Sequence, residues 1–277
     1  MKPSSKVQFT PYEVSFCLYD TERTAFWKQA IEDTVKKGHV VIDAGAGTGI
    51  LGVFAAMDGA KHIYSLELHP RFCRLIDNLA KNNGVPDKFT IMNGDASQMK
   101  LPEKADVLIC ELLCTGQFFE PQISVINNLR KYLKPGGKMI PFAIEHYLQL
   151  YDAHEILYGV QINNDSRSVL LADDEPVSSK VMYDRIDLTK KCKTGVDTVV
   201  KVKARKDREA DAIVINSRAW LTKDLVTERT RFLYNPELIF LKKPVMLKKN
   251  KVYDVHIAYR YGCDTLDVDV SVVSRKS

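Results

Sequence analysis

The strongest constraint on the fold is the segment from Val40 to Ile50, which reads VVIDAGAGTGI. Its first three residues form the apolar run of a buried parallel strand, and glycines follow at positions 45, 47 and 49. Glycine accepts the backbone angles of a sharp turn and lets a ligand lie against bare backbone. Because apolar residues resume directly afterwards, the segment predicts a strand turning into a helix, whose free N–H groups suit an anionic or carboxylate-bearing ligand. A glycine-rich turn without a ligand is the alternative.

The overall composition is that of an ordinary globular protein. Its 277 residues suffice for one large domain or two modest ones. The net charge of +5 is too mild to indicate a nucleic-acid partner. We interpret the lysine clusters at 201–208 and 242–251 as solvated basic surface, in preference to a docking site for an acidic partner.

The cysteines and the N-terminal residues bear on metals and location. The six cysteines form no CxxC pair, and Cys110 and Cys114 have no Cys/His partners at zinc spacing elsewhere. The sequence therefore predicts no metal centre, and free thiols in a reducing, cytoplasmic environment. The opening MKPSSKVQF lacks the apolar stretch of a signal peptide, and no run of about 18 apolar residues occurs. We therefore expect neither secretion nor a membrane span.

Strand and helix patterns alternate through the first half of the chain, after twenty residues without a clear pattern. Candidate helices cover 21–35, 71–83 and 121–133, and candidate strands cover 62–68, 88–92 and 105–111, with another starting at 139. This alternation is typical of βαβ units. It predicts an α/β fold with a doubly wound, mostly parallel, Rossmann-like sheet covered by helices on both faces.

The pattern changes after Pro141. Apolar residues alternate with polar ones, as in 197–202, 212–215 and 251–258, and Asp264–Val273 reads as a clear period-2 strand. This half predicts a mostly antiparallel β module. We therefore divide the chain into a ligand-binding domain at 1–141, which includes an N-terminal helix, and a β domain at 142–277.

Acidic residues at three strand ends indicate which ligand the glycine turn holds. Asp43 precedes the first glycine, Glu67 ends the next strand, and Asp95 follows the third. A carboxylate at Glu67 suits the two hydroxyls of a ribose, and Asp95 lies where an adenine edge would fall. Each acid alone is a weak signal, since acids also cap turns. Together they fit a ligand with ribose, adenine and a positive charge, such as S-adenosylmethionine, better than a pyrophosphate cofactor such as NAD.

These motifs resemble the protein arginine methyltransferases. The resemblance runs from DTERT at 20–24 through the glycine turn, IYSLEL, the 94–97 turn and ADVLICELL, and it is weaker after residue 140, where that family has a β-barrel. It implies that S-adenosylmethionine is held by the following residues: Arg23 on its carboxylate, Gly45 and Gly47 against its methionine part, Glu67 on its ribose with Leu68 beside it, and Asp95 and Ala96 around its adenine. Arg23 also reads as an ordinary surface arginine of a helix.

The strand 105–110 leads into a loop that reads ELLCTGQFFE. The family carries two glutamates at this same separation, in its double-E loop, so the resemblance assigns catalysis to Glu111 and Glu120. Two carboxylates brought together by a loop form a receptor for a planar, permanently charged guanidinium. Glu111 has a structural ion pair as its alternative, and Glu120 a favourable charge at a helix start.

The resemblance fails at the acceptor side. Tyr234 and Asn235 stand where the family has the His and Trp of a Thr-His-Trp loop, and Leu112-Leu113 replaces a Trp-Met pair. The family's Tyr-Phe pair before the first helix is also missing, with Tyr12 and Phe16 as partial substitutes.

Three readings therefore remain open: an arginine methyltransferase acting on protein or peptide, a methyltransferase with a small-molecule acceptor, and a cofactor-binding relative without activity. The strand end CELL, in place of Asn/Asp-Pro-Pro-aromatic, argues against a nucleic-acid base as acceptor. The family also suggests a homodimer, formed through an arm that 157–180 does not clearly reveal.

Overall fold

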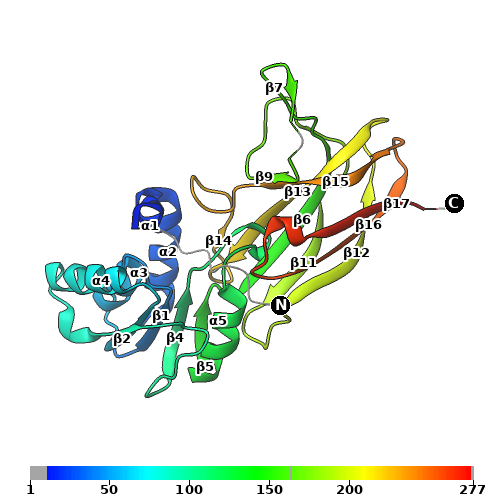
Figure 1. The fold of residues 1–277 in the computed structure, drawn as a ribbon. Helices are drawn as coiled ribbons and strands as arrows, with labels where there is room; N and C mark the ends of the chain where they lie inside the picture. Colours follow the sequence, from blue (N-terminus) through cyan, green and yellow to red (C-terminus); the bar gives the residue numbers. More distant parts are fainter. Residues whose placement is uncertain (1–10, 163, 276–277) are drawn as a thin grey trace.

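The glycine-rich segment forms the central strand of a parallel sheet. The computed structural model describes residues 11–162 and 164–275, which form two lobes lying side by side (Figure 1). In the first lobe, strand β1 (Val40–Ala44) lies between two pairs of neighbours in the order β3-β2-β1-β4-β5. These neighbours are β2 (His62–Glu67), β3 (Phe89–Asn93), β4 (Ala105–Cys110) and β5 (Leu133–Ile140). Every pairing is parallel, which confirms the predicted sheet.

Helices cover this sheet. They are α1 (Pro11–Tyr19), α2 (Thr21–Thr34), α3 (Ile50–Met57), α4 (Pro70–Asn82) and α5 (Gln122–Leu129). Helix α3 packs between α2 and α4, whereas α5 packs against β4 (Figure 1). Helix α2 starts where predicted because the Asp20 side chain caps it by accepting a hydrogen bond from the Arg23 N–H. The buried side chains of Trp27, Ile42 and Leu108 belong to the core of this lobe.

The structure assigns one stretch that the sequence left open in the first lobe, and it corrects the end of one helix and the start of one strand. Residues 11–19, which carried no clear pattern, form α1. The helix expected at 121–133 ends at Leu129, and a 3₁₀ turn, η3 (Arg130–Tyr132), leads straight into β5. Strand β5 begins earlier than expected because Leu133 already pairs with Ala105 of β4. The register then shifts, and the next paired residues are Val107 and Lys138.

The second lobe consists of antiparallel strands. Its larger sheet has the path β10-β6-β13-β15-β9, with β11 on β6 and β14 on β13, and its smaller sheet has the order β12-β16-β17. The bounds are β6 (Ala143–Asp152), β9 (Ser166–Arg167), β10 (Glu175–Pro176), β11 (Val181–Asp187), β12 (Gly195–Lys203), β13 (Glu209–Trp220), β14 (Val226–Thr227), β15 (Glu237–Met246), β16 (Val252–Arg260) and β17 (Asp269–Ser274). Contacts of β12 with β11 and of β17 with β15 close the two sheets around a second core. This confirms a barrel-like antiparallel lobe.

A short hairpin projects from this lobe, at the top of Figure 1. It consists of β7 (Ile156–Leu157) and β8 (Val160–Gln161). Strand β5 ends at Ile140 and β6 begins at Ala143. We propose on this basis that the chain divides into domains 1–141 and 142–277.

The predicted strand Asp264–Val273 is wrong in its first half. Residues Thr265–Asp267 form a 3₁₀ turn, η4, and strand β17 covers only Asp269–Ser274. The alternation of side chains misled the prediction, because the Asp264 carboxylate accepts a hydrogen bond from the Leu266 N–H and so favours a turn. In the part of the chain that the structure describes, no helix is both long and apolar enough to cross a membrane.

Candidate active site

A cavity of about 350 Å³ opens at the carboxyl ends of the parallel strands, where open α/β sheets bind their ligands. Its wall combines the glycine turn with the ends of β2 and β4, the turn after β3, helix α1 and the 232–237 loop of the second lobe. Among the residues predicted for the site, those that line this cavity are Arg23, Gly45, Gly47, Glu67, Leu68, Asp95, Ala96, Glu111 and Glu120.

The glycine turn leaves the cavity floor without side chains. Gly45 has a φ of +69°, and a Cβ added there would lie 2.5 Å from the Leu112 side chain. Gly47 has a φ of +54°, and its N–H donates to the Glu67 carboxylate over 2.8 Å. The other Glu67 oxygen accepts a hydrogen bond from the His69 N–H, also over 2.8 Å. Glu67 is therefore fixed by backbone donors at the cavity edge, where a ribose would present its hydroxyls.

Asp43 is the exception among the predicted site residues. It is buried behind the turn, does not line the cavity, and accepts a hydrogen bond from the Gly52 N–H of α3 over 3.1 Å. Burial raises the pKa of Asp43 to about 7, although the hydrogen bond from Gly52 opposes that rise. Its contact with α3 holds the helix against the strand end.

The third predicted acid, Asp95, organises the turn after β3. One of its oxygens accepts hydrogen bonds from the Ser97 N–H at 3.0 Å and from the Ser97 hydroxyl at 2.6 Å. The other oxygen accepts a hydrogen bond from Gln98. This arrangement presents Ala96 to the cavity, close to the exposed Leu68. The two apolar side chains offer surface to a flat ring system.

Arg23 reaches from α2 to Glu111, the first glutamate of the loop 111–120. One Nη donates to the Glu111 carboxylate, and the other donates to the Cys17 carbonyl over 3.0 Å. Burial raises the pKa of Glu111, and the neighbouring Arg23 charge opposes that rise. Arg23 and Glu111 therefore form a buried ion pair inside the cavity.

Glu120 has no such cation beside it among the residues that the structure describes. Burial, together with the negative charge of Glu111, raises the pKa of Glu120 from 4.5 to about 8. Two carboxylates of one loop thus share a cavity in which the second holds its proton near neutral pH. Strongly shifted pKa values of this kind cluster at functional sites.

Hydrogen bonds from both lobes fix the loop between these glutamates. The buried Gln122 side chain of α5 donates to the Cys110 carbonyl and accepts from the Leu112 N–H, both over 2.9 Å. The Gly116 N–H donates to the Ser217 hydroxyl of β13 over 2.9 Å, and the Thr115 hydroxyl donates to the Asn235 carbonyl over 2.5 Å. The sequence analysis did not predict these hydrogen bonds to the second lobe, because no local pattern indicates a partner more than a hundred residues away in the chain.

Behind Ser217 lies a buried histidine. The Ser217 hydroxyl, which accepts from the Gly116 N–H, also lies 2.7 Å from Nδ1 of His146. Burial lowers the pKa of His146 to about 3, so its ring is neutral, and the imidazole tautomer decides which of the two groups donates this hydrogen bond. The pair holds Gly116 at its position in the loop.

Around the cavity, side chains of each lobe pack into the hydrophobic core of the other. Phe118 of the catalytic loop lies in the core of the second lobe, whereas Leu233 and Tyr234 pack into the core of the first. The Asp20 carboxylate accepts from the Thr230 hydroxyl over 2.5 Å and from the Phe232 N–H over 2.8 Å. The loop that the second lobe contributes to the cavity wall, at 232–237, is therefore attached to the start of α2.

Tyr234 and Asn235, the positions where the resemblance failed, line the cavity. The Tyr234 hydroxyl is buried and has no hydrogen-bond partner among the described residues. Phe16, proposed as a partial substitute in the N-terminal pair, packs against Phe232 with ring centroids 5.1 Å apart and the ring planes tilted by 37°. The side chain of Tyr12 lies outside the described residues.

Comparison with known proteins shows the family. The family model for ribosomal protein L11 methyltransferase (PrmA) matches residues 20–144. An uncharacterized protein of Methanocaldococcus jannaschii is 34% identical over 257 residues, which cover 92% of this chain and 94% of that protein. Protein arginine N-methyltransferase 6 of Xenopus laevis is 30% identical over 196 residues, or 61% of this chain and 57% of the Xenopus protein. The chain belongs to the protein arginine methyltransferase-like family. It is a methyltransferase, and its cofactor is S-adenosylmethionine.

The fold of this methyltransferase agrees with that family. The Trypanosoma brucei PRMT1 enzyme–prozyme heterotetrameric complex with AdoHcy superposes with a TM-score of 0.76 at 17% identity, over 92% of this chain and 90% of that chain. The bare floor at Gly45, where a Cβ would collide with Leu112, and the carboxylate at the end of β2 both fit S-adenosylmethionine. The chain spans little more than half the length of the Xenopus relative.

Proposed function

We propose that this methyltransferase transfers a methyl group to a guanidinium nitrogen of an arginine in a protein or peptide. The observation that carries the proposal is the pair Glu111 and Glu120, two partly buried carboxylates of one loop that line the same cavity as the glycine turn. A guanidinium offers five N–H donors in one plane and remains protonated in proteins. It is the biological cation that best satisfies two such carboxylates.

We assign the cofactor-binding roles as follows. Glu67 binds the ribose hydroxyls, Asp95 and Ala96 border the adenine, and Gly45 and Gly47 make room for the methionine part. Arg23 has donors enough to hold both the cofactor carboxylate and Glu111, since its guanidinium forks toward two partners. When bound, S-adenosylmethionine supplies a methyl group activated by its positively charged sulfur.

Positioning is the main contribution of the catalytic loop. Glu111 accepts hydrogen bonds from two guanidinium nitrogens, which draws positive charge toward them and leaves lone-pair density on the third. That nitrogen would then be free to take the methyl group, which the bound cofactor would supply with its sulfur leaving as a neutral thioether. Holding the two reacting atoms in line supplies much of the rate.

Glu120 orients the attacking nitrogen and takes the proton that methylation releases. The pKa of Glu120 is about 8 without a substrate. A bound guanidinium places a positive charge beside this carboxylate and so lowers that pKa. Substrate binding near pH 7 is therefore expected to release a proton and to leave Glu120 ionised, ready to act as a base.

The acceptor is identified by incubating the protein with labelled S-adenosylmethionine and a lysate of its host, then hydrolysing the labelled material to amino acids. We expect labelled methylarginine in the protein fraction. Label only in small molecules would replace an arginine acceptor with a small one, and absence of any transfer would favour a cofactor-binding relative without activity.

Two substitutions separate the assigned roles. Glu111→Gln should abolish transfer while calorimetry shows nearly unchanged affinity for S-adenosylmethionine, because Glu111 binds the acceptor. Glu67→Ala should instead weaken cofactor binding. Undiminished turnover of the Glu111 variant would refute the two-glutamate assignment, and unchanged affinity of the Glu67 variant would remove its role at the ribose.

A small-molecule acceptor is the second candidate, and one observation favours it. Tyr234 fills part of the cavity wall with a buried hydroxyl that lacks a partner among the described residues, at the position where the family has a His-Trp pair. A buried hydroxyl without a partner selects ligands that satisfy it. The labelling experiment described above distinguishes the two candidates: an arginine acceptor places the label in the protein fraction, and a small-molecule acceptor places it in the small molecules.

We further propose that the protein is a cytoplasmic homodimer. The six cysteines are free, as a reducing compartment requires. The projecting hairpin β7–β8 exposes Tyr158 completely and leaves Ile156 and Val160 more than half exposed. Light scattering should give the mass of two chains, and Tyr158→Asp should give the mass of one.

A further inference from the structure

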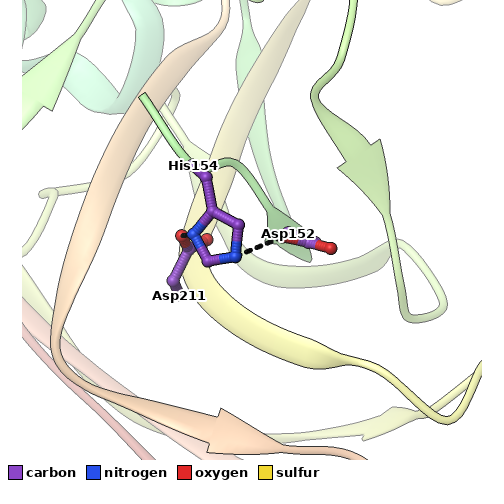
Figure 2. Close-up of side chains that lie close together, drawn as sticks. All are labelled: Asp152, His154 and Asp211. Atoms are coloured by element: carbon purple, nitrogen blue, oxygen red, sulfur yellow. Dashed lines mark ion pairs between the residues drawn. The ribbon is translucent and has the colours of Figure 1, made fainter. Parts of the chain in front are cut away.

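A cluster of three metal-ligating side chains lies outside the methyl-transfer site. Asp152 ends β6, His154 lies two residues further at the start of the segment that carries the hairpin β7–β8, and Asp211 comes from β13. None of the three lines the cofactor cavity. Figure 2 shows the imidazole of His154 between the two carboxylates.

Each ring nitrogen of His154 lies at ion-pair distance from one of the two carboxylates. Nδ1 of His154 lies 2.9 Å from Oδ2 of Asp211, and Nε2 lies 3.3 Å from Oδ1 of Asp152. One ligand atom from each residue lies within 4.8 Å of the others. A tetrahedral zinc ion with bonds of about 2.1 Å needs its ligand atoms about 3.4 Å apart, so ion binding would turn the imidazole until one of its nitrogens faces both carboxylates.

Each carboxylate has one oxygen fixed by the protein and one directed at the imidazole. Oδ1 of Asp211 accepts a hydrogen bond from the Ala153 N–H over 2.8 Å, and Oδ2 of Asp152 accepts one from Arg208 over 2.5 Å. Such outer contacts orient the ligands of protein metal sites. The second oxygen of each carboxylate thereby faces the His154 imidazole.

The backbone and the surroundings favour the same arrangement. The pairing of β13 with β15 shifts register between Ala210 and Ala212, and an irregularity of this kind re-aims the side chain that it carries, here Asp211. The two carboxylates are buried, whereas the imidazole is 55% exposed, so an ion can reach the cluster from solvent. The nearby cation, Arg208, is shared between Asp152 and Glu175, whereas Asp211 meets no cation other than His154 among the described residues.

We propose that Asp152, His154 and Asp211 bind a divalent transition-metal ion of the zinc type, with water in the fourth position. One imidazole nitrogen and two carboxylate oxygens suit zinc, cobalt or nickel better than calcium or magnesium, which prefer oxygen ligands alone. The ion would join the end of β6, the base of the projecting segment and β13. This inference is independent of the methyl acceptor.

Cobalt is the probe of choice because its spectrum reports its ligands. The full-length protein is stripped with a chelator and titrated with Co²⁺, and zinc binding is then measured by calorimetry. We expect saturation at one ion per chain, visible absorption bands of a nitrogen- and oxygen-ligated ion, and no sulfur-to-cobalt charge-transfer band. Such a band would assign the ion to cysteines and overturn the proposal.

His154→Asn tests the site directly, and because His154 is largely exposed the variant is expected to fold. It should weaken zinc binding at least about tenfold, since even outer-shell changes at metal sites cost about 10- to 100-fold. The matched control is His256→Asn, where Nε2 meets a single exposed carboxylate, that of Asp197, over 2.8 Å. Equal affinity in wild type, His154→Asn and His256→Asn, or no saturable binding, would show that a proton alone occupies the cluster.

Discussion

Glu120→Gln is expected to stabilise the folded protein in alkaline solution while it abolishes methyl transfer. Burial and Glu111 raise the pKa of Glu120 from 4.5 to about 8 in the folded state. The folded chain therefore binds more protons than the unfolded chain between these values, so the free energy of unfolding falls as the pH rises through this window. Below pH 4.5 the carboxyl is protonated in both states and the effect vanishes.

The size of the effect follows from that difference in pKa. A rise from 4.5 to about 8 corresponds to a loss of at most about 5 kcal/mol of stability once Glu120 is ionised in both states. Glutamine carries no charge and does not incur this loss. We expect Glu120→Gln to change the free energy of unfolding by about 1 kcal/mol or less at pH 5, and to raise it by about 4–5 kcal/mol at pH 8.5.

Urea denaturation of the ligand-free protein at both pH values measures this difference. Glu22→Gln, which removes an exposed carboxylate from the first turn of α2, controls for the loss of one negative charge. The wild-type protein and Glu120→Gln should diverge as the pH rises, whereas the control should run parallel to wild type. An equal difference at pH 5 and pH 8.5 would refute the claim that Glu120 is buried with a raised pKa.

Three further substitutions test how the cavity is built. Ser217→Ala leaves the Gly116 N–H without its partner and should cost about 1–3 kcal/mol in urea denaturation, with a fall in kcat larger than any change in cofactor affinity. Asp20→Ala removes the cap of α2 and the bonds to Thr230 and Phe232, and should cost about 2 kcal/mol or more in the same assay. Gly45→Ala should destabilise the protein and weaken S-adenosylmethionine binding in calorimetry, whereas Gly84→Ala, with the same φ of +69° but open space around its Cβ, should show only the backbone cost of about 1–2 kcal/mol.

The local pattern of the first half was sufficient to predict its fold. A buried strand, a glycine turn and a helix form from contacts between neighbours in the chain, so VVIDAGAGTGI and the strands after it identify the parallel sheet. The predicted order also brought Glu67, Asp95 and Glu111 to one edge, since parallel strands end on the same side. Asp43 was predicted at the cofactor but lies behind the turn, because a strand-end carboxylate can equally well hold the following helix.

Only the tertiary structure decided how the catalytic loop is held and what surrounds the acceptor. Ser217 and His146 position Gly116, and Phe118 enters the second core while Tyr234 enters the first. The cluster of Asp152, His154 and Asp211 likewise needs two strands that pair only after folding. These contacts join residues far apart in the chain, and sequence spacing carries no record of such distances. The sequence alone determined the cofactor end of the site, whereas the packing of the two lobes determined the acceptor end.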